Sequence, residues 1–188
     1  MSNLCVWFYN PSLEEHRIFN FNKFVAYLDA PFCHCEIQFP DSTAFTVYMG
    51  TDVVQKKRSF DTSKYTCVRV PCTVQQVHTA RMFAESEAVV RKSFSLLMMT
   101  LTFSGISLSS KQGTFCSKLC ADILIAAELM PAQDTCHISP SALYRYLHEQ
   151  QAQKPQGASA INFNMPTRLQ LSPALAGAHG LGMLKLAS

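Results

Sequence analysis

Charged residues are scarce in this chain of 188 residues, of which they make up 15%, whereas hydrophobic residues make up 48%. The longest basic cluster, Lys56-Lys57-Arg58, has three residues, and the formal net charge is only +3. A nucleic-acid-binding surface requires a denser array of cations, so we expect no nucleic-acid partner and interpret the cluster as a solvated loop. The low charge and high apolar content instead predict a chain that buries a sizeable core.

Long apolar runs are also missing. The most apolar stretch, Phe94 to Leu108, contains several Ser and Thr and one Gly, and it is shorter than the roughly 20 residues that span a bilayer. We therefore predict a buried helix or core segment there and no transmembrane segment. The first residues, MSNLCVWFYN, lack the positive charge and apolar core of a signal peptide, which favours a cytoplasmic location.

Paired CxxC motifs at zinc spacing are absent, although the chain has eight cysteines. A domain of this size needs no disulfides for stability, so we expect reduced thiols. Cys33 and Cys35 flank His34, but strand alternation would direct the two cysteines to the face opposite the histidine. We accordingly predict no bound metal and no cofactor.

Alternating apolar residues and turn residues predict an antiparallel sheet. Strands are expected over 4–10, 32–39, 42–50 and 65–72, with the middle pair joined as a hairpin through Pro40-Asp41. Helical periodicity predicts a short helix over 19–28 and longer helices over 74–91 and 115–130. Ser139 and Pro140 have the residue types of an N-cap and first position of a further helix. The pattern as a whole predicts an α+β fold with an antiparallel sheet packed against helices.

The composition changes near Gln151, where Gln, Ala, Gly, Ser and Pro become frequent. We therefore expect one folded domain over 1–150 and a weakly ordered C-terminal tail over 151–188.

Cys116 is the main nucleophile candidate. It lies in GTFCSKLC, where a polar, glycine-containing loop leads into an apolar helix. Backbone N–H groups at a helix N-terminus stabilise negative charge, so a cysteine placed there has a lowered pKa and more thiolate. The alternative is an ordinary buried cysteine, because free cysteine is among the most buried residue types. Cys120, one turn further along, is expected to pack in the core.

A thiolate nucleophile needs a base, and His34 is the best candidate because it begins a predicted core strand. Glu36, two residues further on, shares its strand face and could orient the imidazole; Gln38 and Thr46 are the alternatives. The other histidines lie in or beside predicted helices, in a loop or in the tail: His78, His137, His148, His16 and His179.

The order of these features resembles the circularly permuted, NlpC-type branch of the papain-like cysteine peptidase and amidase superfamily. The stretches that carry the resemblance lie between Leu4 and Leu147: HCEIQF with FTVYMG, KKRSF, YTCVRVPCTVQQVHTARMF, GTFCSKLCADILIAAEL and ISPSALYRYL. The resemblance implies Cys116 as nucleophile, His34 as general base and a polar residue, here Glu36, as orienter. The stretch RKSFSLLMMTLTFSG departs from the glycine and aromatic pattern of that branch.

The implied activity is hydrolysis of a peptide, isopeptide or amide bond through a thioester on cysteine. Two alternatives remain open: a lipid acyl hydrolase or acyltransferase on the same fold, and an inactive binding or structural protein. The expected partner is a peptide, protein or lipid substrate; direct membrane attachment of the tail is not expected, since it has few cations. Similar domains occur in large DNA viruses and in bacteria, so a viral protein, located in host cytoplasm or virion, is compatible with the resemblance.

Overall fold

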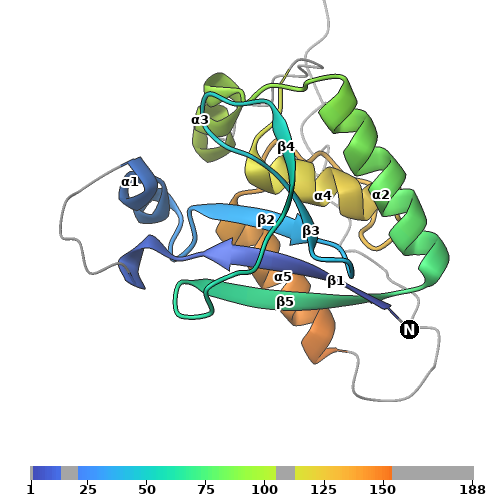
Figure 1. Ribbon diagram of the computed structural model, residues 1–188. Helices are drawn as coiled ribbons and strands as arrows, with labels where there is room; N and C mark the ends of the chain where they lie inside the picture. Colours follow the sequence, from blue (N-terminus) through green and yellow to red (C-terminus); the bar gives the residue numbers. More distant parts are fainter. Residues whose placement is uncertain (1, 14–20, 105–112, 154–188) are drawn as a thin grey trace, which may run out of the picture. The chain divides into compact units, whose positions relative to one another are not determined.

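The computed structural model describes residues 2–13, 21–104 and 113–153 (Figure 1). The chain divides into two compact units, Met1–Pro155 and Gln156–Ser188, and the second unit lies outside the described residues. The predicted boundary at 150 and the predicted tail therefore stay predictions, apart from the observation that the last helix continues to Ala152.

Five strands and a set of helices make up the described unit. In chain order its elements are β1 (Ser2–Tyr9), η1 (Pro11–Leu13), α1 (Phe21–Leu28), β2 (His34–Gln38), β3 (Thr43–Val47), β4 (Val53–Lys57), β5 (Tyr65–Cys72), α2 (Val74–Val89), α3 (Leu96–Ser104), α4 (Cys116–Ala126) and α5 (Pro140–Ala152).

The strands form one antiparallel sheet in the order β4-β3-β2-β1-β5. The predicted β2–β3 hairpin and the predicted strand β5 are confirmed. The register pairs Trp7 with Glu36 and Tyr9 with His34 across β1 and β2, so these four side chains share one face of the sheet. Leu4, Val6 and Phe8, which alternate with them, are fully buried on the other face.

Helices α4, α2 and α5 pack on the apolar face of the sheet (Figure 1). The core there joins Phe45 and Ile37 from the strands to Leu119 and Ile123 from α4, all of which are fully buried. The α+β class is thus confirmed. The predicted cap of the last helix is confirmed: Ser139 caps α5 ahead of Pro140. Thr73 starts α2 with a capping box.

Three sequence expectations are corrected. Lys56 and Lys57 belong to β4 and not to a loop, because β4 alternates half-buried and exposed side chains at the sheet edge. The apolar stretch after Phe94 does contain a helix, α3, but Leu96 and Leu97 in its first turn are exposed. Helix α4 ends at Ala126, four residues before the predicted Met130, and Glu128 then adopts a positive φ of 55°.

No helix among the described residues is both long and apolar enough to cross a membrane.

Candidate active site

Cys116 is the first residue of α4, as predicted, and its position is fixed by the segment that precedes it. Thr114 donates from its backbone N–H to the Ser93 carbonyl at 2.9 Å and accepts from the Ser95 N–H at 2.8 Å. Gly113 has a φ of +90°, and a Cβ at this position would lie 2.6 Å from the Ser95 Cβ. Only glycine therefore allows this close approach of the two segments immediately before the helix.

His34 is the first residue of β2, the central strand of the sheet, and lines the same cavity as Cys116. Its side chain is 15% exposed, and the Tyr48 ring stacks on the imidazole with 5.0 Å between centroids and 21° between planes. The neighbouring Cys33 N–H donates to the Tyr9 carbonyl at 3.2 Å, which fixes the chain just before the histidine. Strand pairing and ring stacking thus hold the imidazole in one orientation.

Three neighbouring groups lower the pKa of the Cys116 thiol: the Cys35 thiol, the His34 ring and the Cys35 backbone N–H. The hydrogen bond from the Cys35 thiol, together with the charge of His34, holds the pKa of Cys116 well below its usual range although burial opposes this. Burial also disfavours a charged imidazole, but the Cys116 thiolate and Glu36 outweigh it and raise the pKa of His34 to about 9. Both shifts favour the charged pair, thiolate and imidazolium, over the neutral thiol and imidazole.

Thr46 on β3 fixes the other side of the imidazole. Its hydroxyl lies 3.1 Å from His34 Nε2 and donates to the Cys35 carbonyl at 3.1 Å. Because a hydroxyl has a single proton and the carbonyl can only accept, the Thr46 oxygen must accept a hydrogen bond from Nε2–H. Nε2 therefore has a proton in both the neutral and the charged ring. Nδ1 is left as the nitrogen that exchanges a proton near Cys116.

Glu36 is close to the imidazole but is not its nearest polar neighbour. Its Oε1 lies 3.6 Å from His34 Nε2, accepts from the Tyr48 hydroxyl at 3.1 Å and forms an ion pair with Arg58. The carboxylate is fully buried, and although burial opposes the charge, His34, Arg58 and Lys56 lower the pKa of Glu36. Glu36 therefore contributes negative charge beside the imidazolium, while His34 Nε2–H donates its hydrogen bond to the Thr46 hydroxyl.

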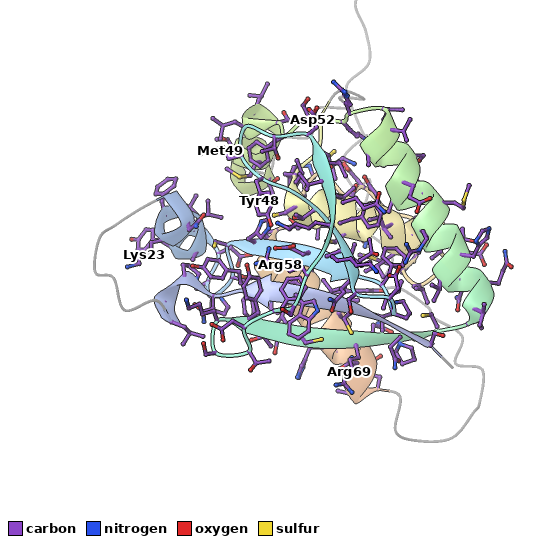
Figure 2. All side chains as sticks on the ribbon, viewed as in Figure 1. Lys23, Tyr48, Met49, Asp52, Arg58 and Arg69 are labelled. Atoms are coloured by element: carbon purple, nitrogen blue, oxygen red, sulfur yellow. The ribbon has the colours of Figure 1, made fainter. Side chains whose placement is uncertain are left out.

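Arg58 and Tyr48 complete this polar cluster, and sequence reasoning missed both of them. Arg58 donates to the Tyr48 hydroxyl at 2.8 Å and to the Tyr65 hydroxyl at 2.7 Å. Arg58 and Tyr48 are labelled in Figure 2. Burial and the charge of Glu36 raise the pKa of Tyr48 to about 12, so its phenol stays protonated and donates to Glu36. The signal available in the sequence was the alternation VVQKK, which would have identified β4 and placed Arg58 at its end.

Gln38, the third alternative orienter, does not contact His34. Its side chain accepts from Trp7 Nε1 at 2.8 Å and donates to the Arg58 carbonyl at 2.6 Å. Of the competing histidines, His78 and His148 are exposed on helices, and His137 lies near Asp134 after α4. His16 and His179 lie outside the described residues.

A cavity of about 710 Å³ opens over the Cys116–His34 pair, a volume typical of small-ligand sites. Its lining combines apolar and polar side chains. The apolar ones include Val25 of α1, Met49 of the β3–β4 turn and Met99 of α3. The polar ones include Arg58, Ser59, Asp61, Lys64 and Tyr65.

The thiols around Cys116 are free and densely packed. Cys35 and Cys120 are fully buried with their sulfurs 3.7 Å apart, as expected for core cysteines. Cys35 shares its strand face with the core residues, opposite His34. Within the described part of the chain, no three His, Cys, Asp or Glu side chains gather as a potential metal site.

In comparisons with known proteins, no protein-family model, no curated protein and no solved structure matches the chain.

Proposed function

We propose that the protein is a papain-like cysteine hydrolase that cleaves a peptide, isopeptide, amide or related acyl bond through a thioester on Cys116. The observation that carries the proposal is the pairing of the Cys116 thiol, at the N-terminus of α4, with an imidazole whose second nitrogen is fixed by Thr46. A structural cysteine requires neither a helix terminus nor a charged partner.

The chain order supports the finer assignment to the circularly permuted, NlpC-type branch. The histidine begins a central strand early in the chain, and the cysteine begins a helix that packs on that strand much later. We assign Cys116 as nucleophile, His34 as general base and acid, and Thr46 together with Glu36 as the groups that orient the imidazole.

In the first half of the reaction, the Cys116 thiolate attacks the substrate carbonyl carbon and a tetrahedral oxyanion forms. The first N–H groups of α4 are suited to hold this oxyanion, because the N-cap residue Phe115 has no side-chain acceptor to occupy them. Collapse of the intermediate breaks the scissile bond, and His34 gives its proton to the leaving amine or alcohol. An acyl thioester remains on Cys116.

In the second half, neutral His34 takes a proton from water, and the hydroxide attacks the thioester carbonyl. The thiolate leaves, His34 is again an imidazolium, and the carboxylic acid product departs. The Nε2–H bond to Thr46 keeps Nδ1 directed at the reacting atoms in both halves.

Alkylation by iodoacetamide across pH, followed by peptide mass spectrometry, tests the proposal. We expect Cys116 to react ahead of the other buried cysteines at near-neutral pH, and to lose this lead in His34→Ala, because a neutral side chain no longer stabilises the thiolate. Cys5 provides an internal control: the hydrogen bond from Cys67 lowers the pKa of Cys5 to about 7 without any contribution from His34.

The His34→Ala substitution should therefore slow Cys116 and leave Cys5 unchanged. If Cys116 reacts no faster than the buried cysteines, or if its rate does not depend on His34, the catalytic proposal is wrong. The fold would then serve a binding or structural role.

A further inference from the structure

Two thiols that the proposed reaction does not use lie beside the nucleophile. Cys35 and Cys120 are fully buried and free, and their sulfurs are 3.7 Å apart. Cys35 follows His34 on β2, and Cys120 lies one turn after Cys116 on α4, the helix that packs against β2 (Figure 1). Cys35, Cys116 and Cys120 therefore form one cluster, of which only Cys116 lines the cavity.

Helix geometry brings Cys116 close to the other two thiols. Residues four apart on a helix share a face with their Cβ atoms about 5–6 Å apart, and each Cβ points toward the helix N-terminus. The Cys120 side chain, whose sulfur contacts that of Cys35, therefore leans toward the turn that begins with Cys116. The electrostatics agree, since the Cys35 thiol is the neighbour that lowers the pKa of Cys116 most. Cys35 is thus a neighbour of both cysteines of α4.

The three thiols differ in how readily an oxidant attacks them. An accessible thiol with a low pKa is oxidised first, to a sulfenic acid, and a sulfenic acid condenses with an adjacent thiol to form a disulfide. Cys116 faces the cavity and has the lowered pKa, whereas burial encloses Cys35 and raises its pKa well above the usual range. In thiol–disulfide exchange the thiol with the lower pKa leaves faster. A disulfide between Cys35 and Cys116 would therefore release Cys116 when Cys120 attacks the Cys35 sulfur.

We propose that Cys35 and Cys120 form a thiol relay, which takes up the oxidation of Cys116 by a peroxide and stores it as a Cys35–Cys120 disulfide. The inference rests on the reactive Cys116 thiolate of the proposed function and does not require hydrolysis. It assigns to the two buried thiols the protection of the nucleophile against irreversible oxidation.

The oxidation consumes one hydrogen peroxide and two thiols. The Cys116 thiolate attacks a peroxide oxygen, the O–O bond breaks, and the departing hydroxide takes the His34 proton and leaves as water. The Cys35 thiol then displaces the hydroxyl of the Cys116 sulfenic acid, which leaves as a second water with the Cys35 proton. Finally, the Cys120 thiol attacks the Cys35 sulfur. Cys116 leaves as a thiolate, and His34 takes up the Cys120 proton.

Disulfide mapping of the full chain after treatment with hydrogen peroxide tests the relay. The protein is denatured with N-ethylmaleimide to block the remaining thiols, and peptides are identified by mass spectrometry. In the wild type we expect a Cys35–Cys120 disulfide and a blocked, unoxidised Cys116. A native sample, freed of peroxide, should still be alkylated at Cys116 by iodoacetamide. The wild-type map decides the pairing by itself, so it does not depend on the folding of any variant.

Three variants resolve the order of the steps. Cys120→Ala should stop at a Cys35–Cys116 disulfide, with loss of Cys116 alkylation until dithiothreitol restores it. Cys35→Ala should lose Cys116 alkylation permanently, because an unresolved sulfenic acid proceeds to sulfinic and sulfonic acids. Cys116→Ala should form no Cys35–Cys120 disulfide. The matched control is Cys72→Ala, which removes another buried core thiol, on β5, and should behave as the wild type does.

Sulfinic or sulfonic acid on Cys116 of the wild type, with free Cys35 and Cys120, would overturn the relay. A Cys35–Cys116 disulfide as the wild-type end product would overturn the transfer to Cys120. Equal disulfide yields in Cys116→Ala and the wild type would overturn the entry through Cys116. The proposed function is tested separately, by alkylation before any peroxide is added. Rapid, His34-dependent alkylation of Cys116 without a Cys35–Cys120 disulfide after peroxide would reject this inference and leave the cysteine hydrolase proposal intact.

Discussion

At the scale of single residues, the orientation of His34 depends on one hydroxyl. Thr46 accepts from Nε2–H, and the buried carboxylate of Glu36 lies slightly further away. Both groups stabilise the imidazolium. The thiolate–imidazolium pair is present above the lowered pKa of Cys116 and is lost as the pH rises through the His34 pKa of about 9. Turnover should therefore decline above this pH, because His34 no longer has a proton for the leaving group.

The Thr46→Val substitution removes the acceptor and keeps the shape of the side chain. We expect the pKa of His34, followed by NMR titration of its ring, to fall by about one unit, because one hydrogen bond to a charged group is lost. The alkaline limit of turnover should shift to lower pH with it. Thr43→Val is the matched control: Thr43 lies on the same strand and donates to Asp41, far from the imidazole. An unchanged His34 pKa in Thr46→Val would show that Thr46 does not orient the ring.

The sequence was sufficient to predict the residues whose geometry is local. His34 and Glu36 share a face because strand side chains alternate, and Cys116 begins a helix because a glycine-containing loop precedes an apolar period. The choice between Glu36 and Thr46 could not be made, since it depends on the register of β2 against β3. Arg58 was missed for a similar reason: its approach to Glu36 depends on how the chain leaves the edge strand β4.

At the scale of elements, the start of α4 depends on a tight crossing between two segments. Gly113→Ala would force a Cβ into Ser95 and impose a positive φ on alanine. We expect a loss of about 1–3 kcal/mol in the free energy of unfolding and slower alkylation of Cys116, as the helix start is displaced. Chemical denaturation and iodoacetamide kinetics measure the two effects.

Gly50→Ala separates backbone strain from steric overlap. Gly50 has a φ of +79°, similar to that of Gly113, but no atom lies within 4 Å of a Cβ added there. This variant should lose about 1 kcal/mol and leave the Cys116 rate unchanged. Equal effects of the two substitutions on Cys116 would mean that the Gly113–Ser95 contact does not position the nucleophile.

The exposed first turn of α3 shows that an apolar sequence pattern does not determine which side chains of a helix are covered. The stretch after Phe94 is uniformly apolar, and such a run predicts burial without indicating what covers it. Leu96 and Leu97 are exposed, although Met99 in the same helix lines the cavity. Periodicity fails here because both sides of the helix have apolar residues, and only the tertiary arrangement separates the side chains that line the cavity from those that are exposed.

At the scale of the whole molecule, the cysteines should become accessible to alkylation in two different ways. Cys116 faces the cavity and can react in the native state, whereas Cys35 and Cys120 are fully enclosed between β2 and α4. An enclosed thiol reacts only when the core opens, so its alkylation rate follows the population of the unfolded state. Cys35 and Cys120 should therefore share one urea dependence, which Cys116 does not follow at low urea.

Leu143→Ala tests this separation. Leu143 is fully buried on α5 in the main core, and its truncation should lower the free energy of unfolding by at least about 2 kcal/mol. Because 1.4 kcal/mol corresponds to a factor of ten, alkylation of Cys120 in the absence of urea should accelerate at least about thirtyfold. The Cys116 rate should not change, since its reaction requires no unfolding. Parallel acceleration of Cys116 would mean that its thiol is reached only by opening the core, which contradicts a nucleophile that works in the folded protein.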